Sequence, residues 1–274
     1  MPRYSYHFTM KGLLAAAVIA LASCRTQHAW IRFDQASDFE VYQPARRQAW
    51  PFSRSMPYDR DFKVSKIFRS WTTAYQFPFV VVFSGAKEKF RFEISGRIPE
   101  ATDSFHAKVF CTARIREKDF PLFFVGIPPL VYNVMPPDKY ENFFFGKVYS
   151  SDSLKFGHSF FAIGEPPFIL MPRQMSEGYL MLDTTKFAIV GVNSVANLKG
   201  DRPVFTGHIV GFEVYDAHKE KLVMGVSAVN EGRVWLRKNL TTKEKNHLMA
   251  LASALLLRRD LKEIHQNVKS GFQP

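Results

Sequence analysis

The sequence has few cysteines and none of the common catalytic signatures. Only two of its 274 residues are cysteines, so at most one disulfide can form. It contains no Gly-x-Ser-x-Gly, no His-Glu-x-x-His, no glycine-rich phosphate loop and no Cys-x-x-Cys. Several histidines are scattered singly: His106, His158, His208 and His218. No metal site and no cofactor are predicted, and the chain is expected to be non-enzymatic. Because catalytic residues can converge from distant positions, a hydrolase is kept as the weaker alternative.

The amino-terminal apolar run is too short to span a bilayer. It covers about a dozen residues after Arg3 and Lys11, whereas a transmembrane helix needs about 20 apolar residues. This length and the positive leader are typical of a secretory signal peptide. The run ends in Leu21-Ala22-Ser23-Cys24. These four residues resemble the lipobox of bacterial lipoproteins, in which a small-residue tripeptide precedes a cysteine.

The resemblance implies that the thiol of Cys24 receives a diacylglyceryl group and that residues 1–23 are removed. Acyl chains at the new amino terminus would hold the chain on a membrane, since each buried methylene contributes about 0.8 kcal/mol. In enterobacterial lipoproteins an Asp after the cysteine favours retention in the inner membrane. Because Arg25 occupies that position here, the outer membrane, on its periplasmic or surface face, is preferred. The alternatives are an ordinary signal peptide with an accidental cysteine, or an uncleaved helix. With Cys24 acylated, Cys111 is alone, so the fold must be stabilised by its core.

The mature chain is basic and rich in phenylalanine. Removal of residues 1–23 leaves 251 residues and lowers the net charge from +12 to +10, from 35 basic and 25 acidic residues. A basic exported protein is expected to bind anionic phospholipids, lipopolysaccharide-like phosphates or acidic glycans, and nucleic acid is not expected as a partner. The 27 phenylalanines indicate an aromatic β core. The alternative is a Phe-lined cavity for an apolar ligand, as in a carrier or receptor.

The pattern along the chain predicts four parts. Residues 1–23 form the signal peptide, residues 24–60 a lipidated tether or arm, residues 61–240 an antiparallel β domain, and residues 241–274 a carboxy-terminal helix packed on that domain. The arm is irregular and carries three prolines between Gln43 and Tyr58.

Two stretches of alternating polarity predict the clearest strands, over Glu88–Ile98 and Phe105–Arg116. A hairpin that pairs Ile94 with Val109 and Phe92 with Cys111 sets every inward residue opposite another, so Cys111 is predicted to be buried. Further short runs predict strands over Phe77–Phe83, Leu122–Ile127, Phe143–Tyr149, Ser159–Ile163, Tyr179–Leu182, Phe187–Val192, Thr206–Tyr215, Leu222–Val229 and Val234–Leu236. The expected fold is mainly β, an antiparallel β-sandwich or open barrel of short strands with one carboxy-terminal α-helix over residues 241–268.

The outward side of the predicted hairpin is basic, with Glu93 as its acidic residue. The candidate anion-binding face comprises Lys89, Arg91, Arg97, His106, Lys108, Arg114 and Arg116. The alternative is that these charges only keep the solvated side of a sheet soluble.

Thr241 and Glu244 form a capping-box pattern that predicts the start of the helix. Its apolar residues form two stripes on nearly opposite sides. One interpretation is a helix enclosed between sheet and arm, and the other is a second stripe available to a protein partner. The sequence therefore favours a membrane-anchored bacterial envelope lipoprotein, a structural, assembly or binding module with an anionic or protein partner.

Overall fold

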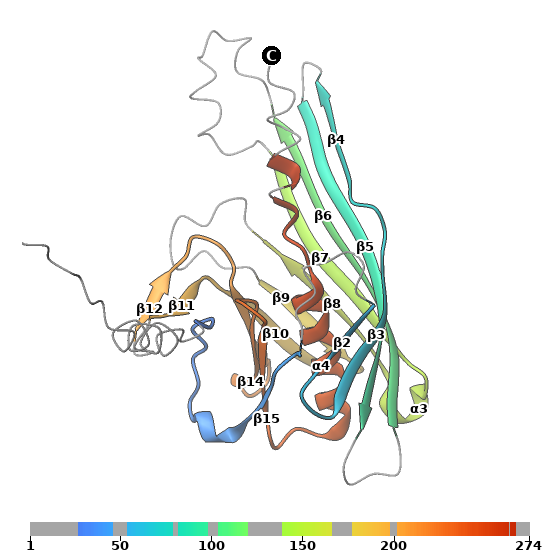
Figure 1. Cartoon of the computed structure of the whole chain (residues 1–274), viewed down its shortest axis with the longest axis vertical. Coiled ribbons are helices and arrows are strands. Elements are labelled where there is room, and N and C mark those ends of the chain that lie inside the picture. Colours follow the sequence, from blue (N-terminus) through green and yellow to red (C-terminus); the bar gives the residue numbers. More distant parts are fainter. Residues whose placement is uncertain are drawn as a thin grey trace, which may run out of the picture.

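The computed structural model describes residues 27–45, 54–78, 82–97, 104–119, 139–165, 177–197, 202–262 and 264–266 (Figure 1). The predicted signal peptide, Cys24 and the strand predicted over residues 122–127 lie outside these residues. Among the described helices, none combines the length and the apolar content needed to cross a membrane.

One large antiparallel sheet dominates the molecule, and most of its strands pair with their neighbours in the chain. Its strands are β1 (Phe39–Tyr42), β2 (Ser55–Pro57), β3 (Phe62–Arg69), β4 (Thr73–Pro78), β5 (Val82–Arg97), β6 (Ser104–Asp119), β7 (Lys139–Ser150), β8 (His158–Gly164), β9 (Glu177–Leu182), β10 (Thr185–Val192), β13 (Gly211–Asp216), β14 (Lys221–Ser227) and β15 (Arg233–Arg237). Their order is β1-β15-β14-β13-β10-β9-β8-β7-β6-β5-β3-β2, and β4 pairs with β5. The remaining elements are η1 (Ala36–Asp38), the pair β11 (Ser194–Ala196) and β12 (Pro203–Phe205), α3 (Ser153–Phe156) and α4 (Thr242–Leu257).

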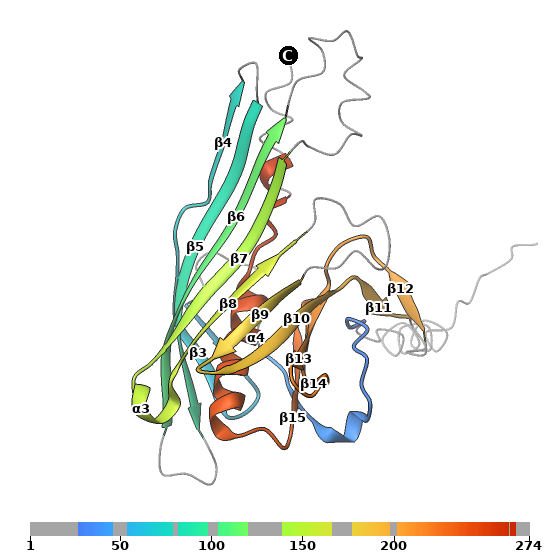
Figure 2. The ribbon, with the colours of Figure 1, turned by 180° about the vertical axis from the view of Figure 1, so that it is seen from behind.

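The sheet curls around α4 without closing into a barrel (Figures 1 and 2). Just beyond its two end strands, β1 and β2, an isolated bridge joins Pro44 and Tyr58. Both end strands come from the segment predicted as an arm, so over these residues the arm is part of the sheet. The prediction of a mainly β, antiparallel fold with one carboxy-terminal helix is confirmed.

The β5–β6 hairpin has the predicted faces but a different register. Residues predicted to point inward are buried, including Cys111, which is 3% exposed. Phe92 pairs with Val109 and Phe90 with Cys111, two residues away from the predicted pairing. Because side chains alternate every second residue, a shift of two leaves each face intact, and the polarity pattern cannot detect it.

Two other predicted strands have different bounds. The run Phe77–Phe83 spans the end of β4 and the start of β5, which pair with each other as a hairpin. The run Thr206–Tyr215 is a strand only from Gly211 onward. The predicted meander of three strands is present as β13, β14 and β15.

Helix α4 begins as predicted and ends earlier. Both hydrogen bonds of the capping box between Thr241 and Glu244 are present. Helix α4 stops at Leu257, because Arg258 is extended and Arg69 donates a hydrogen bond to the carbonyl of Leu257. The predicted helix is therefore interrupted at residues 258–260, and residues 261–262 and 264–266 are helical again. Every helix residue from Asn246 to Leu257 is buried, since the curled sheet, including β2 and β3, surrounds the helix. Neither predicted stripe is exposed within α4.

The inner face of the sheet changes character where α4 ends. Strands β5 and β6 have 16 residues each, as does α4, but a strand rises about 3.3 Å per residue and a helix about 1.5 Å, so the strands extend beyond the helix (Figures 1 and 2). Beside the helix the inward residues are apolar. Beyond its end polar residues lie among apolar ones such as Ala86 and Ile115, and buried Glu88 and Glu165 pair with Arg69 and Arg258.

Candidate anion-binding face

The seven residues of the predicted anion-binding face all occupy outward positions of the β5–β6 hairpin, and Arg97, at the end of β5, lies near the start of α4. Six of them are exposed and Arg114 is half-buried. They do not form one compact cluster. Lys89, Arg91, Lys108 and Arg114 occupy the middle of the hairpin. His106 and Arg97 lie toward one end and Arg116 toward the other, and Arg97 is roughly 20 Å from Arg91 along the strand at about 3.4 Å per residue.

The acidic residue of this face is already paired. A bulge in β3 gives Lys66 a φ of 49° and brings its ammonium 2.9 Å from Glu93. The hydrogen bond from Lys66 lowers the pKa of Glu93, which remains a carboxylate at neutral pH. Among the described residues, Lys89, Arg91 and Lys108 form no ion pair, so their charges are available to a ligand.

Exposed aromatic side chains share this outer side. They continue from β6 onto the next three strands: Phe110, Phe143, Phe145, Tyr149, Phe160 and Tyr179. The rings are arranged in edge-to-face pairs, with centroids 5.8 Å apart for Phe110 and Tyr149 and 6.0 Å apart for Phe160 and Tyr179. The sequence pattern placed Phe110 outward. It missed the aromatic residues of β7 because Phe143-Phe144-Phe145 has no polar residue to mark its exposed side.

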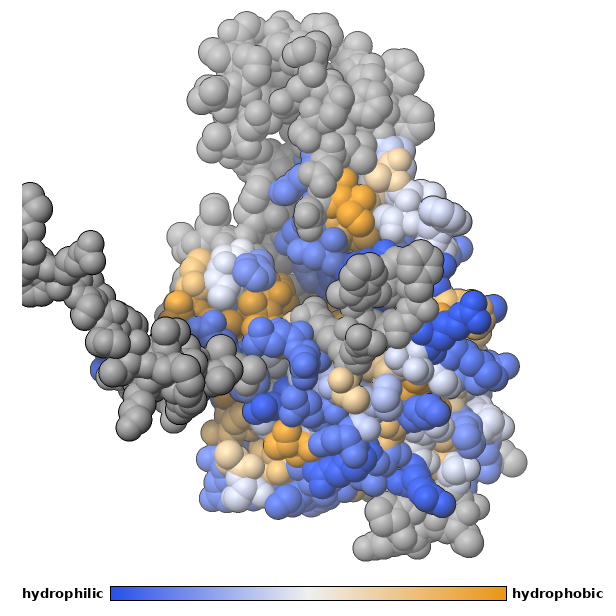
Figure 3. Space-filling model, in the orientation of Figure 1, coloured by the Kyte–Doolittle hydropathy of each residue, from blue (hydrophilic) through white to orange (hydrophobic). Residues whose placement is uncertain are grey.

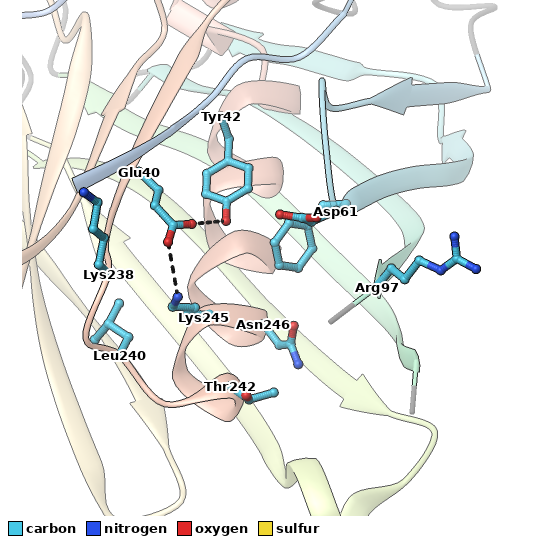
Figure 4. Close-up of a pocket in the computed structure, with 10 residues that line it drawn as sticks. Glu40, Tyr42, Asp61, Arg97, Lys238, Leu240, Thr242, Lys245 and Asn246 are labelled. Carbon is cyan, nitrogen blue, oxygen red and sulfur yellow. Dashed lines mark hydrogen bonds and ion pairs between the residues drawn. The ribbon is translucent and has the colours of Figure 1, made fainter. Parts of the chain in front are cut away.

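Arg97 also lines a polar pocket of about 430 Å³ between β1, the start of α4 and the β5 end (Figure 4). Glu40 accepts a hydrogen bond from the Tyr42 hydroxyl at 2.7 Å and pairs with Lys245 at 3.7 Å. Burial and the bond to Glu40 raise the pKa of Tyr42. The Nδ2 group of Asn246 is buried in the wall without a hydrogen-bond partner. In the view of Figure 3, the lower half of the described surface is largely hydrophilic.

Two buried serine–histidine pairs lie inside the domain. Ser159 Oγ is 2.7 Å from His247 Nδ1, and His247 Nε2 donates to the carbonyl of Phe156 at 2.8 Å. Ser84 Oγ and a Glu117 oxygen both approach the same nitrogen, Nε2 of His265, at 2.9 and 3.4 Å. A catalytic triad needs serine and carboxylate on opposite ring nitrogens, so neither arrangement is a triad. Burial lowers the pKa of His247 to about 4, which keeps its ring neutral.

The buried phenylalanines pack around α4. Phe90 stacks on Phe92 and on Phe144, and Phe105 contacts the ring of His247 on the helix. These contacts pack the phenylalanines of the sheet against one another and against the helix. No group of three or more His, Cys, Asp or Glu residues in the described part of the chain could hold a metal ion.

Comparison of the chain with protein-family models, with curated proteins and with solved structures finds no match.

Proposed function

We propose that this chain is a bacterial envelope lipoprotein, held on a membrane by acyl chains on Cys24, whose β domain binds an anionic component of the envelope. The supporting observation is the outer side of β5 and β6, where exposed cations face a single, already paired carboxylate. Exposed aromatic rings on the adjacent strands would add apolar contact to the charge attraction. The outer membrane is the preferred location, because Arg25 stands where an inner-membrane lipoprotein often carries Asp.

Charge-assisted hydrogen bonds from lysine and arginine to phosphate, sulfate or carboxylate would supply the affinity. Such contacts at an exposed surface are screened by salt, with a Debye length of about 8 Å at physiological ionic strength. The proposed interaction therefore weakens steeply as salt is added. If these charges only keep the sheet soluble, replacing particular residues of the face should not change the salt concentration at which the chain elutes.

The test is elution of the full chain, in mild detergent, from an immobilised phosphate matrix with increasing salt. One variant replaces Arg91, Lys108 and Arg114 with Ser. A matched control replaces three exposed basic residues elsewhere, Arg202, Lys219 and Lys221, so the net charge falls equally. The face variant is expected to elute at clearly lower salt than the control. Equal elution of the two variants would show that only net charge matters and would refute the proposed face.

The anchor is tested separately by intact mass of the chain extracted from its own membrane. Cleavage before Cys24 with added acyl mass, lost together with membrane attachment in Cys24→Ala, is the expected result. An unacylated wild-type chain in the soluble fraction would refute it.

A further inference from the structure

The sheet register aligns one outward residue from each of seven neighbouring strands. Arg91 pairs with Phe68 on β3 and with Phe110 on β6, and the alignment continues through β7, β8 and β9 to β10. These residues form the cross-strand row: Phe68, Arg91, Phe110, Lys147, Phe160, Met181 and Lys186. Three of them are strongly exposed aromatics, Phe68 at 50%, Phe110 at 42% and Phe160 at 45%.

Rings and cations alternate along this row. From β3 to β8 the order is aromatic, cation, aromatic, cation, aromatic, and Lys186 follows after Met181. Neighbouring strands lie about 4.8 Å apart, so cations on alternate strands lie roughly 10 Å apart. The row thus presents an alternation of apolar surface and positive charge over roughly 29 Å, six inter-strand spacings, perpendicular to the strands.

The side chains of the row are held in place by their neighbours. The guanidinium carbon of Arg91 lies 5.0 Å from the centre of the Phe68 ring, and Lys186 lies 5.7 Å from the centre of the Tyr179 ring. Phe110 and Phe160 each contact another exposed ring. Because these contacts restrict the side chains before binding, less conformational entropy is lost when a ligand is bound.

The shape of this surface favours a flexible chain over a flat membrane. The sheet curls around α4, so its outer side is convex (Figures 1 and 2). Neighbouring strands rotate by about 20–25°, and six such steps accumulate on the order of 120–150°. A planar bilayer can contact only part of such a row, whereas a linear polymer can follow it from β3 to β10.

We propose that the cross-strand row binds a linear acidic polysaccharide that runs across the strands; this rests on the proposed anion-binding function. Pyranose rings present an apolar C–H face that packs on an exposed phenylalanine, and their carboxylates or sulfates bind Arg91, Lys147 and Lys186. A polyanion without rings leaves the phenylalanines unused, and a neutral glycan leaves the cations unused. The alternation matches a ligand that carries both features in one chain.

The experiment measures binding of the full chain, in detergent micelles, to polygalacturonate and to polyacrylate, a polyanion without sugar rings. The aromatic variant carries Phe110→Ala and Phe160→Ala. Its matched control carries Trp71→Ala and Phe205→Ala, two exposed aromatics outside the row. The charge variant carries Arg91→Ser and Lys147→Ser. Unchanged melting temperatures establish that each variant is folded, and oligogalacturonates of increasing length test whether the ligand extends along the row.

The aromatic variant is expected to bind polygalacturonate about tenfold or more weakly, and a tenfold loss is equivalent to ~1.4 kcal/mol. Its affinity for polyacrylate should be unchanged. The charge variant should weaken binding to both, and affinity should rise with oligomer length. If the aromatic variant binds polygalacturonate like the control, the polysaccharide inference fails while anion binding stands. If the charge variant is also unaffected, the proposed function fails too. A third outcome is that binding to phosphatidylglycerol micelles requires Phe110 and Phe160 while binding to polygalacturonate does not. This result would overturn the inference in favour of a membrane contact.

Discussion

Lowering the pH from 7 to 5 is expected to destabilise this fold through the buried imidazole of His247. Burial lowers its pKa from 6.5 to about 4, and its two nitrogens are already used by Ser159 and by the carbonyl of Phe156. Protonation would place a second ring proton against the Ser159 hydroxyl inside the core. Lys243 and Asp183, which pair with each other, and His158 are the other groups that act on the ring.

The direction in which stability changes with pH depends on whether the folded or the unfolded state binds the proton more tightly. The folded pKa lies below the unfolded value, so the stabilisation is fully present above pH 6.5 and is lost as the pH falls toward 4. The difference between the two pKa values corresponds to about 3 kcal/mol, since one pKa unit is worth about 1.4 kcal/mol. At pH 5 the unfolded imidazole is almost fully protonated and the folded one is mostly neutral. Between pH 7 and pH 5 this residue is therefore expected to lower the unfolding free energy by about 2 kcal/mol.

The assay is equilibrium unfolding in urea at pH 7, 6 and 5 and constant ionic strength, with tryptophan fluorescence as the signal. His247→Gln retains a donor toward Phe156 and removes the titration. This variant should be less stable than wild type at pH 7, yet its unfolding free energy should fall by about 2 kcal/mol less on going to pH 5. His208→Gln, at an exposed loop position, is the control and should follow the wild-type pH dependence. Parallel curves for wild type and His247→Gln would refute the reasoning.

Three further predictions concern the helix and the core. Leu251→Ala, at a fully buried position of α4, should lower the unfolding free energy by about 2–5 kcal/mol in the same urea assay, and a loss below 1 kcal/mol would contradict enclosure of the helix. Thr241→Ala removes the capping box and should cost about 1 kcal/mol, with Thr241→Ser close to wild type; equal losses in both would contradict the capping role. Burial raises the pKa of the Cys111 thiol, so an aromatic disulfide reagent should label Cys111 only at the rate of unfolding, and rapid labelling of the native chain would show that it is accessible.

Local sequence pattern determined the features that depend on neighbouring residues. Alternation over residues 88–116 specified which side chains of β5 and β6 face inward, and the structure confirms the buried Cys111 and the basic outer side. The capping box specified where α4 begins. These predictions succeed because strand faces and helix caps are set within a few residues.

Tertiary structure alone decided the features that depend on pairing between distant segments. The polarity pattern has a period of two, so it could not distinguish the observed β5–β6 register from one shifted by two residues. The end of α4 depends on Arg69, which is far away in the chain, and the run Phe143-Phe144-Phe145 has no polar contrast to orient it. Only pairing of β7 with β6 and β8 turns Phe143 and Phe145 outward, beside the cations of the hairpin. The alternation of rings and charges across the strands exists only in the assembled sheet, because each strand contributes a single residue to it.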